Sequence, residues 1–118
     1  QERDFTYVED IVDGTMLCAE KISDMTPINL GTGVRYKMID VAQMIFKILE
    51  WTPEKISFDT SKPTGAVSRA LDNSLAKELL GWEPRFSLQE GLKKTIEWYD
   101  KNHKRQGHVD ESSLLEHN

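Results

Sequence analysis

The clearest secondary-structure pattern of the chain lies in Pro27–Leu49, PINLGTGVRYKMIDVAQMIFKIL. A short apolar run at 28–30 follows the proline and ends in the glycine-rich turn 31–33, which is typical of a strand that stops at a turn. Apolar residues then recur at helical spacing, and they are Met38, Val41, Ala42, Ile45, Ile48 and Leu49. The stretch therefore predicts a strand, a turn and an amphipathic helix in succession, as in an α/β protein.

The same alternation continues on both sides of this stretch. Phe5–Val8 and Ile56–Phe58 are short runs of β-branched and aromatic residues, and they predict two further strands. Helical spacing predicts a helix over 11–22, another near 75–80 and a last one that starts at the capping box Ser87–Glu90. Strands that alternate with helices favour an α/β fold with parallel pairing.

The predicted strands are too short to make a good sheet, whereas two of the helices carry broad apolar faces. A parallel sheet needs cover on both faces, so these helices are expected to pack on a sheet outside this chain. Gly14 interrupts the first helix at a cost of about 1 kcal/mol relative to Ala, which indicates close packing against a neighbour. Gly81 is expected to end its helix in the left-handed conformation. Residues 1–103 are expected to fold, and the polar residues 104–118 to form a disordered tail.

Composition narrows the class of protein. The 118 residues are enough for one domain, and 38% hydrophobic with 30% charged residues is ordinary for a globular protein. The net charge of −5 argues against nucleic acid as a partner. The single cysteine, Cys18, excludes an internal disulfide, and no apolar run has the ~20 residues of a membrane helix. We therefore expect a cytoplasmic protein with neither a nucleic-acid nor a membrane partner.

Four segments, in order, resemble the extended short-chain dehydrogenase/reductases that act on nucleotide sugars, which are NAD(P)-dependent epimerases and dehydratases. Arg3–Val12, RDFTYVEDIV, resembles their Arg-Asp-Phe segment, and Ile28–Gly33, INLGTG, resembles their Asn-apolar-Gly-x-Gly turn. Asp72–Pro84, DNSLAKELLGWEP, and Ser87–Tyr99, SLQEGLKKTIEWY, are similar to the family's last two motifs.

The loop Phe58–Arg69, FDTSKPTGAVSR, is most similar to that of the GDP-L-fucose synthases, although Ala70 stands where their pattern has Lys. The resemblance implies a small C-terminal, substrate-binding portion of such an enzyme, with the Rossmann domain absent. The chain has no initiator Met and enters almost directly into a strand-like pattern. Both features also lead us to expect a fragment.

The residues that carry the family's chemistry do not occur in this sequence. The turn 31–33 lacks the third glycine of a dinucleotide fingerprint, and no Tyr is followed by Lys four residues later. NAD or NADP is therefore expected in the full-length enzyme but not in this chain alone, which is expected to be inactive. His103, His108 and His117 have no metal-ligand spacing, so no metal site is predicted.

Three cations are the candidates for binding a nucleotide-diphosphate sugar, because a diphosphate needs positive charge beside it. The resemblance implies that Arg3, Lys62 and Arg69 contact the substrate. Each has an alternative role. Arg3 is alternatively a solvated charge or an ion-pair partner of Asp4, Lys62 is an exposed loop lysine, and Arg69 is an ion-pair partner of Asp72.

Five other residues are expected to be structural. Asp72 is predicted to cap its helix, and Asp10 to be an acid of a first helical turn. Phe58, Trp82 and Trp98 are predicted to pack in the core.

A second hypothesis gives the chain a non-catalytic role. It would be a binding or assembly module that has lost its Rossmann half, with its uncovered helix faces buried by self-association or by a partner.

Overall fold

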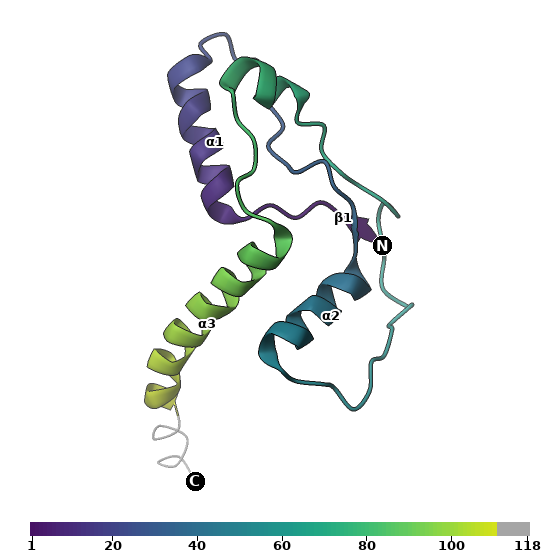
Figure 1. Cartoon of the computed structure of the whole chain (residues 1–118). Helices are drawn as coiled ribbons and strands as arrows, with labels where there is room; N and C mark the ends of the chain where they lie inside the picture. Colours follow the sequence, from purple (N-terminus) through teal and green to yellow (C-terminus); the bar gives the residue numbers. More distant parts are fainter. Residues whose placement is uncertain (111–118) are drawn as a thin grey trace.

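The computed structural model describes residues 1–110, and the side chains of residues 1–103. Its elements are β1 (Glu2–Arg3), α1 (Val8–Lys21), β2 (Tyr36–Lys37), α2 (Met38–Leu49), the π-helical turn η1 (Ala76–Leu80) and α3 (Leu88–Asp110). Figure 1 shows α1 beside the segment that contains η1, α2 on the far side of β1, and α3 leading away towards the C-terminus.

The strand β1 lies between two segments that are distant in the sequence. It pairs antiparallel with β2, with Glu2 opposite Lys37 and Arg3 opposite Tyr36. On its other edge, the Glu2 N–H donates to the Val67 carbonyl at 2.9 Å, and the N–H of residue 69 donates to the Glu2 carbonyl at 3.1 Å. The long connection from α2 therefore returns to the N-terminus of the chain (Figure 1).

The prediction of α2 is confirmed, because the helix runs from Met38 to Leu49 as its apolar spacing indicates. The predicted strand positions are wrong. Residues 5–7 are extended without a ladder partner, and Val8 already begins α1. Residues 28–30 and 56–58 likewise belong to no strand of the described chain. A short apolar run forms a strand only where another strand is available to accept its hydrogen bonds.

The core lies between α1 and η1. Ala76, Leu80 and Trp82 are buried together, and partly buried apolar side chains surround them: Leu17, Cys18, Ile22, Ile28 and Leu30. A Cβ on Gly14 would lie 2.8 Å from both Leu30 methyl groups and 3.0 Å from Trp82 Nε1, which confirms the close packing expected there. Gly81 has φ of +63° and ends η1 in the left-handed conformation, also as predicted.

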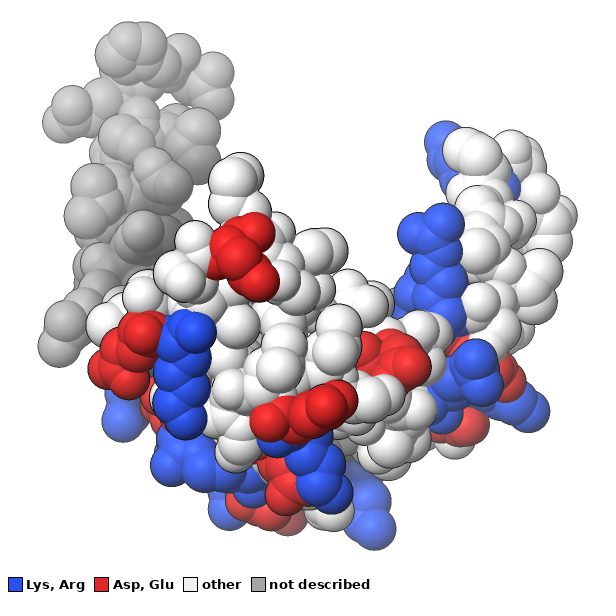
Figure 2. All heavy atoms as spheres, turned by 90° about the horizontal axis from the view of Figure 1, so that it is seen from above, with Lys and Arg blue, Asp and Glu red and all other residues white. Residues whose placement is uncertain are grey.

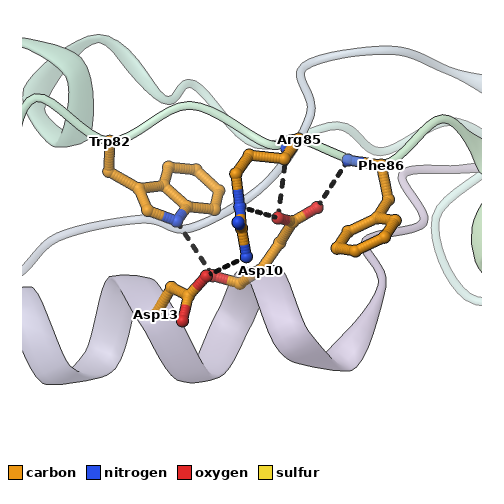
Figure 3. A network of polar contacts seen from close by, with 5 residues as sticks. All are labelled: Asp10, Asp13, Trp82, Arg85 and Phe86. Carbon is orange, nitrogen blue, oxygen red and sulfur yellow. Dashed lines mark hydrogen bonds and ion pairs between the residues drawn. The ribbon is translucent and has the colours of Figure 1, made fainter.

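Asp10 fastens the segment after η1 to α1 (Figure 3). Its carboxylate is 1% exposed and accepts the backbone N–H groups of Arg85 at 3.0 Å and Phe86 at 3.1 Å. The Trp82 Nε1–H donates to the Asp10 carbonyl at 2.8 Å, and Arg85 Nη2 pairs with Asp13 Oδ2 at 2.6 Å. Asp10 is therefore a tertiary cross-link and not only a first-turn acid.

The capping box at the start of α3 is confirmed, because the Ser87 hydroxyl accepts the Glu90 N–H at 3.1 Å. The helix continues to Asp110, beyond His103, where the apolar pattern ends. Residues 111–118, part of the expected tail, lie outside the described residues. In the described part of the chain, no helix combines the length and the apolar character that crossing a bilayer requires.

Several apolar side chains remain uncovered. Trp82 is 3% exposed and packs as predicted, but Phe58 is 74% and Trp98 64% exposed, so the core predictions for these two residues are wrong. Val8, Val12 and Met16 lie four residues apart on α1 and are each more than half exposed. One face of α1 therefore packs on η1 while another has no cover within the described chain.

Candidate substrate-binding site

Arg3 lies on β1 and its half-buried side chain turns towards the loop that follows α2. Nη1 donates to the Glu2 carbonyl at 2.7 Å, and Nη2 donates to the Thr64 carbonyl at 3.4 Å. The ion pair with Asp4, considered from the sequence, is not among the ion pairs of the described side chains. Among the described side chains, Arg3 therefore has no ion-pair partner.

The loop 59–69 is held against β1 at several points. The Thr64 carbonyl also accepts from the Gln1 side chain, and the Ser68 hydroxyl donates to Glu2 Oε2 at 2.9 Å. Gly65 has φ of +65°, with open space around its Cα, so glycine is favoured there by the backbone conformation. Lys62 is exposed in this loop, two residues before Thr64.

Arg69 is exposed directly beside β1, since its backbone N–H donates to the Glu2 carbonyl. The ion pair with Asp72 is also not formed among the described side chains. Asp72 instead accepts the Ser74 N–H at 2.9 Å and the Ser74 hydroxyl, just before the helical segment begins. These bonds, first that of the Ser74 side chain, lower the pKa of Asp72 below its ordinary value.

The structure thus brings Arg3 and the loop that carries Lys62 and Arg69 together on one edge of the small sheet. Figure 2 shows acidic and basic side chains interspersed over the face seen from above, without a broad basic patch on that face. All three cations lack an ion-pair partner within the described side chains.

Asp4 is the residue of this region that the sequence did not reveal. Its carboxylate accepts the Thr32 N–H at 3.1 Å, the Thr32 hydroxyl, the Gly33 N–H at 2.8 Å and the Leu71 N–H at 3.2 Å. Partial burial raises the pKa of Asp4, but the hydrogen bonds from Thr32, Gly33 and Leu71 outweigh it and bring the pKa below 3.8. Its donors lie 28 to 67 residues away, so no local pattern identifies this role.

The same contacts determine what the turn 31–33 can bind. Dinucleotide sites use backbone N–H groups of a glycine-rich turn to hold the pyrophosphate. Here the N–H groups of Thr32 and Gly33 already donate to Asp4, so they are not available to a phosphate. Among the described residues, no three side chains of His, Cys, Asp or Glu gather in a way that could hold a metal ion.

Known proteins resemble this chain in both sequence and structure. The family model for GDP-mannose 4,6 dehydratase matches residues 1–95. A putative GDP-L-fucose synthase 2 of Arabidopsis thaliana is 32% identical over 100 residues, which cover 85% of this chain and 30% of that protein. UDP-glucuronic acid decarboxylase 5 of the same plant is 38% identical over 92 residues, covering 78% and 26%. The chain thus spans about a third or less of these relatives.

Two solved structures show the same fold. The UDP-glucose 4-epimerase of Thermotoga maritima, solved with UDP-glucose, is 36% identical with a TM-score of 0.76, and the match covers 86% of this chain and 32% of that one. The enzyme WbmF of Bordetella bronchiseptica, in complex with NADH, is 25% identical with a TM-score of 0.76, covering 100% and 36%.

These likenesses confirm the predicted fold class, a portion of an extended short-chain dehydrogenase/reductase in which short strands alternate with helices. The family match extends over β1, the loop 59–69 and the start of α3. The chain belongs to the GDP-mannose 4,6 dehydratase family, within the NAD-dependent epimerases and dehydratases of nucleotide sugars.

Proposed function

We propose that this chain is the C-terminal, substrate-binding portion of a nucleotide-sugar epimerase, dehydratase or reductase similar to GDP-L-fucose synthase, and that it binds the diphosphate of the substrate. One observation carries the proposal: the return of the loop 59–69 to β1, which joins Arg3 to the segment of Lys62 and Arg69. A diphosphate bound there would meet positive charge from both sides.

The three cations would act differently. The half-buried guanidinium of Arg3 is already oriented by two carbonyl groups, so little freedom remains to be lost on binding. Arg69 is exposed, but its backbone is hydrogen-bonded to β1. Lys62 is an exposed point charge on a loop and is proposed to contribute least.

The oxidation and reduction steps are assigned to a longer protein. The relatives are about three times the length of this chain, and WbmF was solved with NADH. We infer that NAD or NADP binds to residues of the longer protein outside these 118 and supplies hydride transfer there, in an isomerase or oxidoreductase. A cytoplasmic location remains part of this proposal.

Calorimetric titrations test the proposal. The chain should bind UDP-glucose or GDP weakly, with a dissociation constant on the order of millimolar, because most substrate contacts would lie elsewhere. Arg3→Gln should weaken binding about tenfold or more, since a hydrogen bond to a charged group contributes about 1.5–3 kcal/mol. Lys93→Gln, which removes an exposed lysine on α3, is the matched control and should leave the affinity unchanged.

Two results would overturn the proposal. One is an Arg3→Gln variant with the affinity of the wild type. The other is NAD or NADP binding with a micromolar dissociation constant, because that would require a dinucleotide site in this chain.

A second candidate function is that of a self-associating module without catalytic activity. The uncovered α1 face of Val8, Val12 and Met16 favours it, because an apolar face of this kind needs cover. It predicts that the chain forms oligomers and that Arg3 does not contribute to binding a nucleotide diphosphate. The first candidate requires that contribution.

A further inference from the structure

We propose that Asp4 is a positioning residue for the diphosphate site, which holds the segments of Arg3 and Arg69 at a fixed separation and leaves the Arg3 guanidinium without an acidic partner. The inference rests on the proposed function. It adds a residue that acts through the two arginines and does not itself touch the ligand.

Asp4 joins three segments of the chain. It follows Arg3 directly on leaving β1, and it accepts the N–H groups of Thr32 and Gly33 in the turn that leads to β2. It also accepts the N–H of Leu71, two residues after Arg69. Both neighbours of β1 are therefore fastened at the same end by one carboxylate.

The contacts around the turn leave little room for adjustment. A Cβ on Gly31 would lie 2.7 Å from Leu71 Cβ and 2.9 Å from Asp4 Oδ2, so only glycine allows this approach. The Asn73 side-chain amide donates to the Gly31 carbonyl at 3.2 Å and holds the turn from its other side. A change at Asp4 would thus be transmitted to the segment of Arg69.

The hydrogen bonds also explain why Arg3 keeps its charge free. A carboxylate has about four lone-pair positions, and Asp4 accepts four hydrogen bonds, two on each oxygen. An aspartate next to an arginine would otherwise be an obvious ion-pair partner. Because the acceptor positions of Asp4 are taken, Arg3 turns to the carbonyls of Glu2 and Thr64 instead.

Asp4→Asn tests this role with inorganic pyrophosphate as the probe. In either orientation, the amide NH2 of Asn would face a backbone N–H group that donates to the Asp4 carboxylate in the wild type. We expect pyrophosphate to bind about fivefold more weakly. The dissociation constant is taken from NMR shifts of the folded protein, because a loss of stability alone would not change it.

Asp24→Asn is the matched control, since the Asp24 carboxylate also accepts both the N–H and the hydroxyl of a threonine, Thr26, away from β1. It should leave pyrophosphate affinity unchanged. Should Asp4→Asn fail to fold, Thr32→Val provides the second variant, because it removes one donor and frees an Asp4 lone pair for Arg3. It should weaken binding about threefold.

The outcomes separate the two proposals. Wild-type affinity in both Asp4→Asn and Thr32→Val, alongside a loss in Arg3→Gln, would overturn the role of Asp4 alone. A wild-type chain whose Arg3 and Arg69 resonances do not respond to pyrophosphate would overturn the proposed function and the role of Asp4 with it.

Discussion

Two aspartates, Asp4 and Asp10, hold irregular segments of the chain in place by accepting their backbone hydrogen bonds. Asp4 accepts N–H groups from the turn 31–33 and from Leu71, and Asp10 accepts those of Arg85 and Phe86. Backbone N–H groups in irregular segments need acceptors when they are partly buried. One carboxylate can accept several such bonds: Asp4 accepts three backbone N–H groups and Asp10 accepts two, which explains why these connections are ordered without a sheet around them.

Asp10→Ala should lower the free energy of unfolding by about 3 kcal/mol, because it leaves two backbone N–H groups without a buried acceptor. Asp13→Ala removes only an exposed partner of Arg85 and should cost less than about 1 kcal/mol. Urea unfolding measures both. Equal losses in the two variants would show that Asp10 contributes no more to the free energy of unfolding than Asp13 does.

The lowered pKa of Asp4 predicts an effect of pH on stability. A carboxylate with a lower pKa in the folded state stabilises the fold above its unfolded pKa, and this contribution is lost as the pH falls through the folded value. The urea midpoint should therefore drop more steeply below pH 3.8 in the wild type than in Asp4→Asn. The pKa of Asp24 is also lowered, so the urea midpoint of Asp24→Asn is measured over the same pH range for comparison. Parallel curves for wild type and Asp4→Asn would contradict the assignment.

The roles of some residues could be predicted from the sequence, whereas those of others could not. Arg3, Lys62 and Arg69 were identified through resemblance, and the structure brings their segments together. Asp4 and Asp10 were interpreted locally, as an ion-pair partner and as a first-turn acid. Their actual partners are tens of residues away, and such contacts follow from the tertiary fold.

At the scale of elements, local signals predicted the helices and failed for the strands. The spacing of α2 and the capping box of α3 are contained within a few residues, so both were found. The runs at 5–8 and 28–30 that predicted strands have no ladder partners in the described chain. Conversely, β1 and β2 consist of two residues each, too short to leave a pattern.

Gly14→Ala tests the contact between α1 and the core. Alanine favours a helix by about 1 kcal/mol relative to glycine, but its Cβ would lie 2.8 Å from the Leu30 methyl groups. We expect a net loss of about 1–3 kcal/mol in the free energy of unfolding, as for other overpacked cores. Thr15→Ala, at an exposed position of the same helix, should be neutral or slightly stabilising. A stabilised Gly14→Ala variant would mean that α1 can move away from Leu30.

At the scale of the molecule, the chain exposes far more surface than a self-contained domain. Its accessible area is 9789 Å², against about 6,500 Å² for a folded monomer of its mass. Its radius of gyration is 19.0 Å, against about 13.5 Å for a compact domain of this length. Within the described residues, this surplus includes apolar side chains of the helices that have no cover.

Sedimentation equilibrium tests whether the exposed apolar surface causes the chain to self-associate. The chain alone should self-associate as its concentration rises, through faces such as Val8, Val12 and Met16 and the apolar groove of about 500 Å³ between residues 5–8 and α3. Val12→Glu together with Met16→Glu should shift the equilibrium towards monomer. A wild-type monomer at all concentrations would indicate that the uncovered faces close on one another in solution.

Chemical-shift mapping can show whether Arg3 and the loop 59–69 bind a diphosphate together. Titration of the isotope-labelled chain with UDP-glucose should move the resonances of Arg3, Thr64 and Arg69 in concert, with one dissociation constant, and should leave those of Lys93 unchanged. Shifts confined to residues away from β1, or no saturable shift at Arg3 and Arg69, would contradict such joint binding.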